Sequence, residues 1–428
     1  MLPLLTSALW PPATAYARDQ LPERVLQFGS GMLLRALCVA AVDSANRAGA
    51  RAGRIVVVQS TPEGASRGRA LNAQDGLFTL VERGLSGGAP LERIGLIGAI
   101  SRALAADDVA ANPEIQVIVS NSSEAGFRID APFPGRLTDA LHARFTHSPD
   151  APPVFVIPTE LVPDNGPRLA AMVHEVARTY GQNFRDWLTG GAHVRFCSSL
   201  VDRIVTAPPA DQQAALEAQL GYRDALLTVT EPYALWAVEA DPAELRAVFP
   251  VESASVVFAP DITFYRERKL RLLNAVHTAT VPLALLAGIR TVREAAGHPL
   301  LGAFQKRLLF DEIIPATDIP VDQAHTFAHD VLERFANPWL EHEYRVIATN
   351  QEEKFRIRVV PVIVRGFGPG LALAAAANLT FLRAPLDALG EAARIPEFVA
   401  ATQDWMAVLG REGALAALSQ LVGTARCT

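Results

Sequence analysis

The chain has 428 residues, half of them hydrophobic and 20% charged, with a formal net charge of −6. A chain of this length forms two or three domains, and its mildly acidic balance excludes an electrostatic footprint for nucleic acid or an anionic membrane surface. Its three cysteines lie far apart without a CxxC pair, which excludes a disulfide framework or a cysteine-rich zinc site and favours a reducing cytoplasm.

Residues 1–20 form an apolar N-terminal extension that carries Pro3, Pro11 and Pro12. The extension lacks the basic first region of a secretory signal peptide, so we do not expect it to be cleaved. No uninterrupted run of about 18 apolar residues occurs along the chain, so we expect no membrane-spanning helix.

Strand and helix patterns alternate after this extension. Short apolar runs predict strands at 24–29, 54–60, 77–83, 115–121 and 154–158, and a helical pattern covers 33–47. Three of these runs are rich in valine and isoleucine without alternation, as in a parallel sheet that is buried on both faces. We therefore predict an α/β fold, with a doubly wound, Rossmann-like domain over residues 21–255.

The C-terminal part of the sequence has a different texture. Long patterns rich in alanine and leucine predict helices at 268–290, 323–337, 371–383 and 387–421, with a helix–helix loop at 365–370. Strand patterns are few here. We predict a second, mainly helical domain over residues 256–428.

The segment VLQFGSGMLLRA, residues 25–36, has the order strand, glycine-rich turn, helix. In a dinucleotide-binding fold, Gly29 would make the tight turn and Gly31 would let the backbone approach a pyrophosphate at the helix N-terminus. Leu34 replaces the third glycine of GxGxxG, so an ordinary strand–turn–helix explains the segment as well.

The end of the second strand bears on which nucleotide is bound. An acidic residue usually holds the adenosine ribose at this point, but this strand ends in Gln59 and Ser60. A glutamine can still bond a ribose hydroxyl. Arg67 and Arg69 follow, so the residues alone leave both NAD and NADP open.

The segment KLRLLNAVH places Lys269, Asn274 and His277 inside an apolar helical pattern. At about 100° per residue, the asparagine lies about 140° and the histidine about 80° from the lysine, which puts all three on one flank. A desolvated lysine can act as acid or base in carbonyl reduction, an amide can stabilise the oxyanion, and the imidazole can orient a hydroxyl. The alternative is a lysine that extends to solvent, a capping asparagine and a core histidine.

Seven segments in one order give the chain a family resemblance. They are VLQFGSGMLLRA, NAQDGLFTLVERG, VSNSSEAGF, IPTELVPDNG, FCSSLVDRIV, EPYALW and ERKLRLLNAVHTA. Together they resemble the polyol-specific long-chain dehydrogenases, which include mannitol dehydrogenases, fructuronate reductases and tagaturonate reductases (altronate oxidoreductases). The resemblance covers roughly residues 22–380 and is strongest to the tagaturonate reductase branch.

The resemblance implies NAD as cofactor, metal-independent catalysis, and a site between the two domains. It implies that Lys269 is the acid/base, Asn274 an oxyanion donor and His277 a substrate-orienting group, within a Lys-x4-Asn-x2-His signature. Asp202 would orient the lysine or a relay water, although an ion pair with Arg203 is an equal alternative. The implied cofactor-binding residues are Val25, Leu26, Gln27, Phe28, Gly29, Ser30, Gly31, Met32, Leu33, Leu34, Arg35, Ala36, Asn121 and Glu124.

One departure separates the chain from the mannitol dehydrogenases. Those enzymes carry an Asp-Asn pair whose asparagine helps to form the oxyanion hole, whereas Glu160 and Leu161 stand at these positions here. Asn165, in the following Asn-Gly step, does not simply inherit that role, and we predict that it binds substrate. The second oxyanion donor is therefore not specified.

A sugar-acid substrate carries a carboxylate, which requires a cationic partner. Basic residues follow the catalytic segment at Arg345, Lys354, Arg356 and Arg358. We predict that Lys354 and Arg358 bind substrate, although a solvated basic face also explains such charges. His325 and His329 have i,i+4 spacing, but no carboxylate ligand is specified nearby and we predict no metal.

We therefore expect a keto-uronate reductase that acts on a small sugar acid and is a monomer or small homo-oligomer. A fructuronate reductase or a mannitol-type polyol dehydrogenase is the alternative within the family. A sugar-acid-binding protein on a degenerate dehydrogenase scaffold is the alternative from another class, and the intact lysine, asparagine and histidine argue against it.

Overall fold

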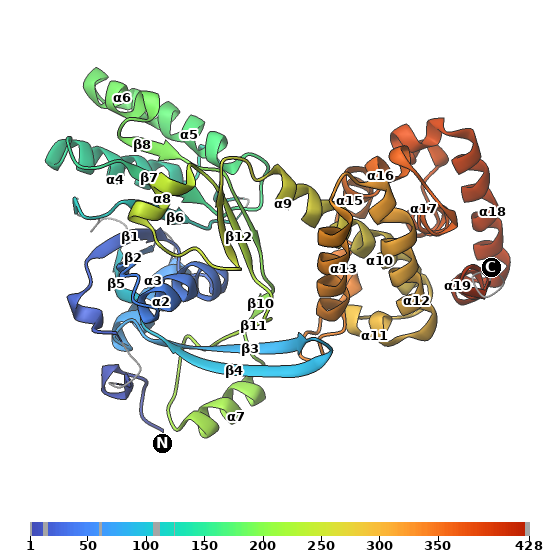
Figure 1. Cartoon of the computed structure of the whole chain (residues 1–428), viewed down its shortest axis with the longest axis horizontal. Coiled ribbons are helices and arrows are strands. Elements are labelled where there is room, and N and C mark those ends of the chain that lie inside the picture. The colour runs from blue at the N-terminus through green and yellow to red at the C-terminus, as the bar shows by residue number, and fades with distance from the viewer. Residues whose placement is uncertain (1, 12–15, 60–61, 106–111, 124, 424–428) are drawn as a thin grey trace. The chain divides into compact units, whose positions relative to one another are not determined.

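The computed structural model describes residues 2–11, 16–59, 62–105, 112–123 and 125–423, and the chain forms two compact units (Figure 1). The first unit comprises Met1–Arg83 and Glu92–Ile262, and the second comprises Gly84–Leu91 and Thr263–Thr428. The first is built around β-sheets, and the second is helical apart from the tip of one hairpin.

The first unit contains a six-stranded parallel sheet in the order β5-β2-β1-β6-β7-β8. Its strands are β1 (Glu23–Phe28), β2 (Arg54–Gln59), β5 (Ile100–Ala105), β6 (Val117–Ser120), β7 (Val154–Pro158) and β8 (Val194–Phe196). Strands β6 and β7 are buried along their whole length, which explains their apolar runs without alternation. The predicted doubly wound α/β fold is confirmed.

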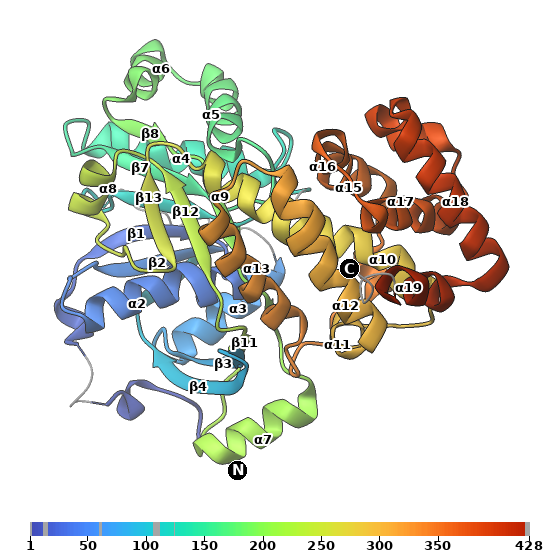
Figure 2. The ribbon, with the colours of Figure 1, turned by 45° about the vertical axis from the view of Figure 1, so that its right-hand side comes forward.

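Helices and a second sheet cover the two faces of this parallel sheet. On one face, Leu26 and Phe28 pack against α4 (Pro132–His147), α5 (Asn165–Val176) and α6 (Gln182–Leu188). On the other face, Val25 and Val57 pack in one core with α2 (Ala40–Arg47), α3 (Pro62–Ala73) and a sheet of β9 (Ser199–Asp202), β12 (Leu235–Glu239) and β13 (Val256–Ala259). Figure 2 shows α5 and α6 on one side of the sheet and α2 and α3 on the other.

The predicted strand at 77–83 is real but lies outside the parallel sheet. It becomes β3 (Phe78–Ser86), which belongs to a four-stranded sheet with β4 (Ala89–Ile97), β10 (Val205–Thr206) and β11 (Thr228–Thr230). Gly87 and Gly88 join β3 to β4 with φ of 59° and 78°, as a tight hairpin turn requires. The tip belongs to the second unit, where the Gly88 N–H donates to Glu333 Oε1 at 2.6 Å.

The remaining elements of the first unit are short. They are α1 (Met32–Leu34), a π-helix (Arg35–Val39), α7 (Ala210–Leu220), α8 (Pro242–Val248), and 3₁₀ turns at Ser7–Leu9, Arg18–Gln20, Ala177–Thr179 and Thr189–Gly191.

The second unit is a helical array around α17. Its helices are α9 (Thr263–Arg268), π (Lys269–Ala275), α10 (Val276–Leu286), α11 (Val292–Gly297), α12 (Pro299–Arg307), π (Leu308–Ile313), 3₁₀ (Ile314–Ala316), α13 (Val321–Phe335), α14 (Tyr344–Ile347), α15 (Gln351–Arg358), α16 (Val360–Arg365), α17 (Pro369–Leu382), 3₁₀ (Leu386–Arg394), α18 (Pro396–Glu412) and α19 (Ala414–Gly423). Four consecutive alanines, residues 374–377, are fully buried, and their small side chains let α10 and α18 pack closely on α17.

The helical pattern expected over 387–421 is divided by backbone-breaking residues. Gly390 and Gly413 have φ of 59° and 81°, and Pro396 starts α18, so the segment forms a 3₁₀-helix and two α-helices. Within the described residues, no helix combines the length and the apolarity needed to cross a bilayer.

Candidate active site

The glycine-rich loop lies where the strand order of the parallel sheet reverses. Strand β1 has β2 on one side and β6 on the other, and such switch points bind ligands at the carboxyl ends of strands. Gly29 follows β1 with φ of +105°, and a Cβ there would lie 3.2 Å from the Asn121 carbonyl oxygen. At Gly31 no atom lies within 4 Å of a built Cβ. The loop thus has one glycine required by the backbone and one open to an approaching ligand.

The buried side chains of Leu34 and Arg35 support this loop. Leu34 is fully buried, and its Cδ1 lies 3.7 Å from a Cβ built on Gly29, so it fills the place of the missing third glycine. Arg35 is also buried and donates to the Ser30 carbonyl at 2.5 Å and to Thr228 Oγ1 at 3.1 Å. Burial lowers the pKa of Arg35 to about 10, so it remains a cation at neutral pH. Its role is to hold the loop.

The other predicted cofactor residues differ in how far they are exposed to solvent. Val25, Leu26, Phe28 and Ala36 are buried in the two cores, where they position the loop. Gln27 is also buried, and its Nε2 donates to the Gly29 carbonyl at 2.9 Å. Gly31, Met32 and Leu33 are half-buried at the start of the helix. Glu124 lies outside the described residues.

Gln59 at the end of β2 has a free donor. Its Oε1 accepts from Ser30 Oγ at 3.1 Å, and the same Oγ accepts from Arg67 Nε at 3.2 Å. The Gln59 Nε2 is buried and has no hydrogen-bond partner among the described residues. An amide N–H at this position fits a ribose hydroxyl oxygen, so these residues fit a dinucleotide. Ser60 lies outside the described residues.

Asn121 and Glu160 line the carboxyl ends of β6 and β7. Asn121 donates through Nδ2 to the Thr159 carbonyl at 3.1 Å. Glu160 is buried and accepts from Ser122 N at 2.8 Å and from Ser120 Oγ at 3.1 Å, and burial raises the pKa of its carboxyl. Leu161 is 68% exposed, so the Glu-Leu pair provides no amide donor here.

Asn165 has a structural role that the sequence did not indicate. Its buried Nδ2 donates to the carbonyls of Pro158, Glu160 and Ser199 at 3.0–3.1 Å, and its Oδ1 accepts from Ser199 N at 2.9 Å. Gly166 follows because a Cβ there would lie 2.6 Å from the Ser198 nitrogen. The Asn-Gly step therefore clamps α5 to the chain before β9, and both amide N–H groups of Asn165 are engaged.

Asp202 is the last residue of β9 and is buried. Its neighbour Arg203 forms an ion pair with Glu82 and donates to the Glu231 and Ala36 carbonyls. Arg203 thus has Glu82 as one carboxylate partner.

The predicted catalytic segment contains an irregularity that the sequence did not reveal. Residues 269–275 form a π-helix between α9 and α10, and π-helical turns are often found at functional sites. Because such a turn closes between residues i and i+5, Lys269 and Asn274 come about one turn apart, rather than at the angle computed for an α-helix. Leu272 and Val276 enter the core as expected.

The three polar residues of this segment are all half-buried. The carboxamide of Asn274 forms no hydrogen bond with any residue that the structure describes. The His277 ring centroid lies 5.2 Å from Phe335, 5.4 Å from His342 and 6.1 Å from Tyr344. Its Nε2 is buried without a partner in the described part of the chain. An amide and an imidazole are thus left with hydrogen-bonding capacity.

His277 is also surrounded by positive charge. Burial, followed by His342, Arg358, Arg334 and Lys354, lowers its pKa to about 3. The imidazole is therefore neutral at physiological pH, and its Nε2 can form a hydrogen bond without carrying charge.

Lys354 and Arg358 are half-buried on α15. The other two basic residues of this segment, Arg345 and Arg356, are exposed. Lys354 Nζ donates to the Ile347 carbonyl at 2.9 Å, and Arg358 Nη1 donates to Thr278 Oγ1 at 3.2 Å. Neither cation is paired with a described carboxylate. Burial lowers the pKa of both, and Arg358 lowers that of Lys354 further.

We call His342, Lys354 and Arg358 the basic cluster. His342 was missed in the sequence because it stands far from His277 along the chain, in a segment without a periodic pattern. Only the packing of the helices identifies it.

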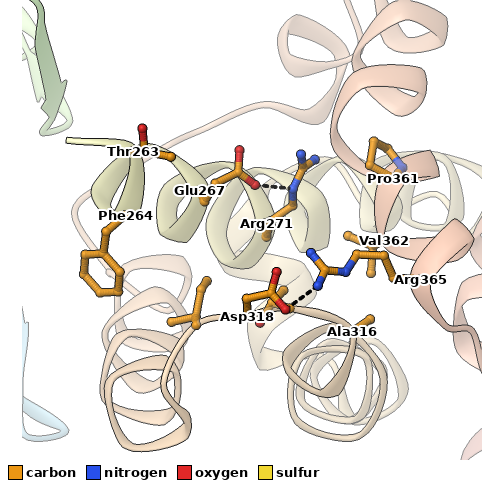
Figure 3. A pocket seen from close by; sticks show the side chains of 11 residues that line it. Thr263, Phe264, Glu267, Arg271, Ala316, Asp318, Pro361, Val362 and Arg365 are labelled. Atoms are coloured by element: carbon orange, nitrogen blue, oxygen red, sulfur yellow. Dashed lines mark hydrogen bonds and ion pairs between the residues drawn. The ribbon is translucent and has the colours of Figure 1, made fainter. Parts of the chain in front are cut away.

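A separate pocket of about 400 Å³ lies in the same unit (Figure 3). Glu267 and Arg271 line one wall and form an ion pair at 2.9 Å, and Asp318 and Arg365 on the other wall also form an ion pair. Lys269 does not line it. The pocket's charges are thus balanced within the protein.

The two histidines at i,i+4 spacing have an aromatic environment. His325 and His329 are exposed, and each ring centroid lies 5.2 Å from Phe310. No group of three or more metal-binding side chains occurs among the described residues.

The sequence matches two family models. Residues 23–247 match the mannitol dehydrogenase Rossmann domain, and residues 261–385 match the mannitol dehydrogenase C-terminal domain. The altronate oxidoreductase of Klebsiella pneumoniae (strain 342) is 38% identical over 394 residues, covering 85% of this chain and 80% of that protein. The altronate oxidoreductase of Bacillus subtilis (strain 168) is 35% identical over 367 residues, covering 80% of this chain and 75% of that protein.

Two solved structures share the fold. D-sorbitol dehydrogenase in substrate-free form has a TM-score of 0.85 at 20% identity, covering 97% of this chain and 100% of that one. The Pseudomonas fluorescens mannitol 2-dehydrogenase ternary complex with NAD and D-mannitol has a TM-score of 0.72 at 24% identity, covering 96% of each chain. Both family models match in order along this sequence, and the chain belongs to the mannitol dehydrogenase family.

Proposed function

We propose that the protein is an NAD-dependent altronate oxidoreductase, which reduces D-tagaturonate with NADH to D-altronate and catalyses the reverse oxidation. Membership of the family makes it a dehydrogenase that acts on CH–OH groups with NAD. The relatives named altronate oxidoreductase cover most of the chain. The observation that carries the choice of a sugar acid is the basic cluster beside His277, since a neutral polyol offers nothing to pair with Lys354 and Arg358.

When bound, NAD would supply the hydride in reduction and accept it in oxidation. In the direction of reduction, the Lys269 ammonium donates a proton to the alkoxide oxygen as it forms, and in oxidation the neutral amine takes that proton back. Asn274 Nδ2 donates to the same oxygen and stabilises its developing charge. His277, neutral in its buried surroundings, bonds a substrate hydroxyl through Nε2. Lys354 and Arg358 hold the carboxylate end.

In the first unit, the backbone of Gly29 and Gly31 and the Gln59 amide would hold the dinucleotide. We keep Asn121 in this set because it adjoins Gly29 at the switch point. Asp202 remains a proposed orienting residue. Asn165 is better explained by its four backbone hydrogen bonds than by contact with substrate.

The test is an assay of the full chain with D-tagaturonate, D-fructuronate and D-fructose, each with NADH and with NADPH. We expect D-tagaturonate with NADH to give the largest kcat/KM. The Lys269→Ala variant, purified in the same way, controls for contaminating reductases. Faster reduction of D-fructose than of either keto-uronate would contradict the proposal, and equal use of NADPH would contradict the cofactor assignment. Activity should also survive exhaustive treatment with EDTA.

A further inference from the structure

His342 occupies a fixed position next to the predicted catalytic histidine. It stands between α13 and α14, where its carbonyl accepts from Val292 N at 3.0 Å and the adjacent Glu343 forms an isolated β-bridge with Thr291. Its ring centroid lies 5.4 Å from that of His277 with an interplanar angle of 43°. Both contacts join residues 342–343 to residues 291–292 and hold the backbone from which the imidazole projects.

The charge that acts on His342 is that of Lys354 on α15. Arg358, also on α15, and Arg334 on α13 act on the adjacent ring of His277. The flanking Glu341 and Glu343 are exposed, and the adjacent Tyr344 is a buried phenol that burial keeps protonated. Burial and Lys354 lower the pKa of His342 below its ordinary value of 6.5. In the free protein the ring is therefore neutral at physiological pH.

We propose that His342 is a specificity residue of the substrate site, which takes up one proton from solvent when the carboxylate of a sugar acid binds beside Lys354 and Arg358. The inference rests on the proposed function and extends it. Burial and the Lys354 charge keep His342 neutral in the free protein, and an anion placed beside Lys354 favours the charged imidazolium. The imidazolium then becomes a third charged donor to the carboxylate. A neutral ketose brings no such charge, so it leaves the ring unprotonated.

The coupling of proton and carboxylate fixes the direction of the pH dependence. Because the carboxylate raises the pKa of His342, protonation and substrate binding favour each other. KM for a keto-uronate should be low in mild acid, rise as the pH passes from the pKa of free His342 to its higher pKa in the complex, and then level off. KM for a neutral ketose should lack this rise.

The kinetic test uses the His342→Gln variant, which keeps polarity but cannot be protonated. We expect its KM for D-tagaturonate in mild acid to increase about tenfold, the equivalent of one pKa unit of coupling, with kcat changed little and the rise of KM with pH abolished. His325→Gln, at an exposed histidine elsewhere in the same unit, is the matched control. A His342→Gln variant that keeps the wild-type pH dependence of KM overturns the inference.

A second measurement on the unaltered enzyme does not depend on how the variant folds. Titration calorimetry of D-altronate into the enzyme, in buffers of different ionisation enthalpy, counts the protons taken up on binding. We expect net uptake near neutral pH with D-altronate and none with D-mannitol. Altronate binding without uptake overturns the role of His342, whereas absence of altronate binding contradicts the proposed function itself.

Discussion

Two groups of basic side chains in the helical unit have opposite surroundings. In the pocket, Arg271 is paired with Glu267 and Arg365 with Asp318. In the basic cluster, Lys354 and Arg358 donate only to a carbonyl and a hydroxyl. A partly buried charge without a counter-charge costs free energy, so two half-buried cations that pair with no described carboxylate, beside a neutral histidine, support the proposed carboxylate site. The two regions thus differ in charge balance.

Replacement of the proposed acid/base should give the largest effect near the basic cluster. Lys269→Ala should lower kcat by about 10²–10⁴-fold and leave NADH binding nearly unchanged, because the cofactor loop lies in the first unit. The pH profile of the oxidation direction should lose its rising limb. Lys306→Ala, at an exposed lysine of α12, is the control. A near-normal kcat with an unchanged profile would contradict the mechanism.

Loss of the proposed oxyanion donor should cost somewhat less. Asn274→Ala should lower kcat by about 10²–10³-fold, as removal of a single oxyanion donor does. Because the carboxamide bonds no described residue, the melting temperature should stay close to that of the wild type. A large loss of stability with normal kcat would identify Asn274 as a structural residue instead.

The basic cluster should act on substrate affinity rather than on turnover. Arg358→Ala should raise KM for D-tagaturonate about 10–100-fold, the worth of a charged hydrogen bond of roughly 1.5–3 kcal/mol. KM for D-fructose should change much less. The exposed Arg356, on the same helix, provides the control Arg356→Ala. An equal increase in KM for D-tagaturonate and for D-fructose in Arg358→Ala would contradict the proposal that the basic cluster, unlike the pocket, binds a carboxylate.

Burial and the nearby positive charges, which lower the pKa of His277, should also make the folded protein sensitive to acid. His277 protonates near 6.5 in the unfolded chain but only near 3 in the folded one, so unfolding takes up a proton between these values. Stability is therefore lost as the pH falls through this window. Denaturant unfolding of His277→Gln should show a shallower pH dependence, by up to about 1.4 kcal/mol per pH unit. An unchanged slope would mean that the pKa of His277 is the same in the folded and the unfolded chain.

A substitution in the pocket that is lined by the two ion pairs should have the smallest effect. Asp318→Asn removes the partner of Arg365, but both side chains are largely exposed, at 84% and 50%, and surface ion pairs contribute little. We expect no measurable change in melting temperature, kcat or KM. A clear loss of activity would show that the pocket takes part in the reaction.

Local patterns predicted the parallel sheet and the glycine-rich loop, because buried strands and φ-positive glycines leave direct marks in the sequence. They did not predict that β3 joins a different sheet, since pairing of strands is a tertiary property. The π-helix at 269–275 was invisible because its composition is that of an α-helix. Asn165, Gln59 and His342 depended on which backbone or side-chain atoms lie opposite them, and spacing along the chain carries no information about that.

The hairpin tip at 84–91 has a consequence for how substrate preference can be exchanged between relatives. The tip packs with the helical unit, where the Gly88 N–H donates to Glu333 of α13, although β3 begins and β4 ends in the first unit. A chimera with a single crossover after Ile262 would join the tip of one parent to the helices of the other. A recombinant that transfers the whole second unit needs three crossovers, after Arg83, Leu91 and Ile262.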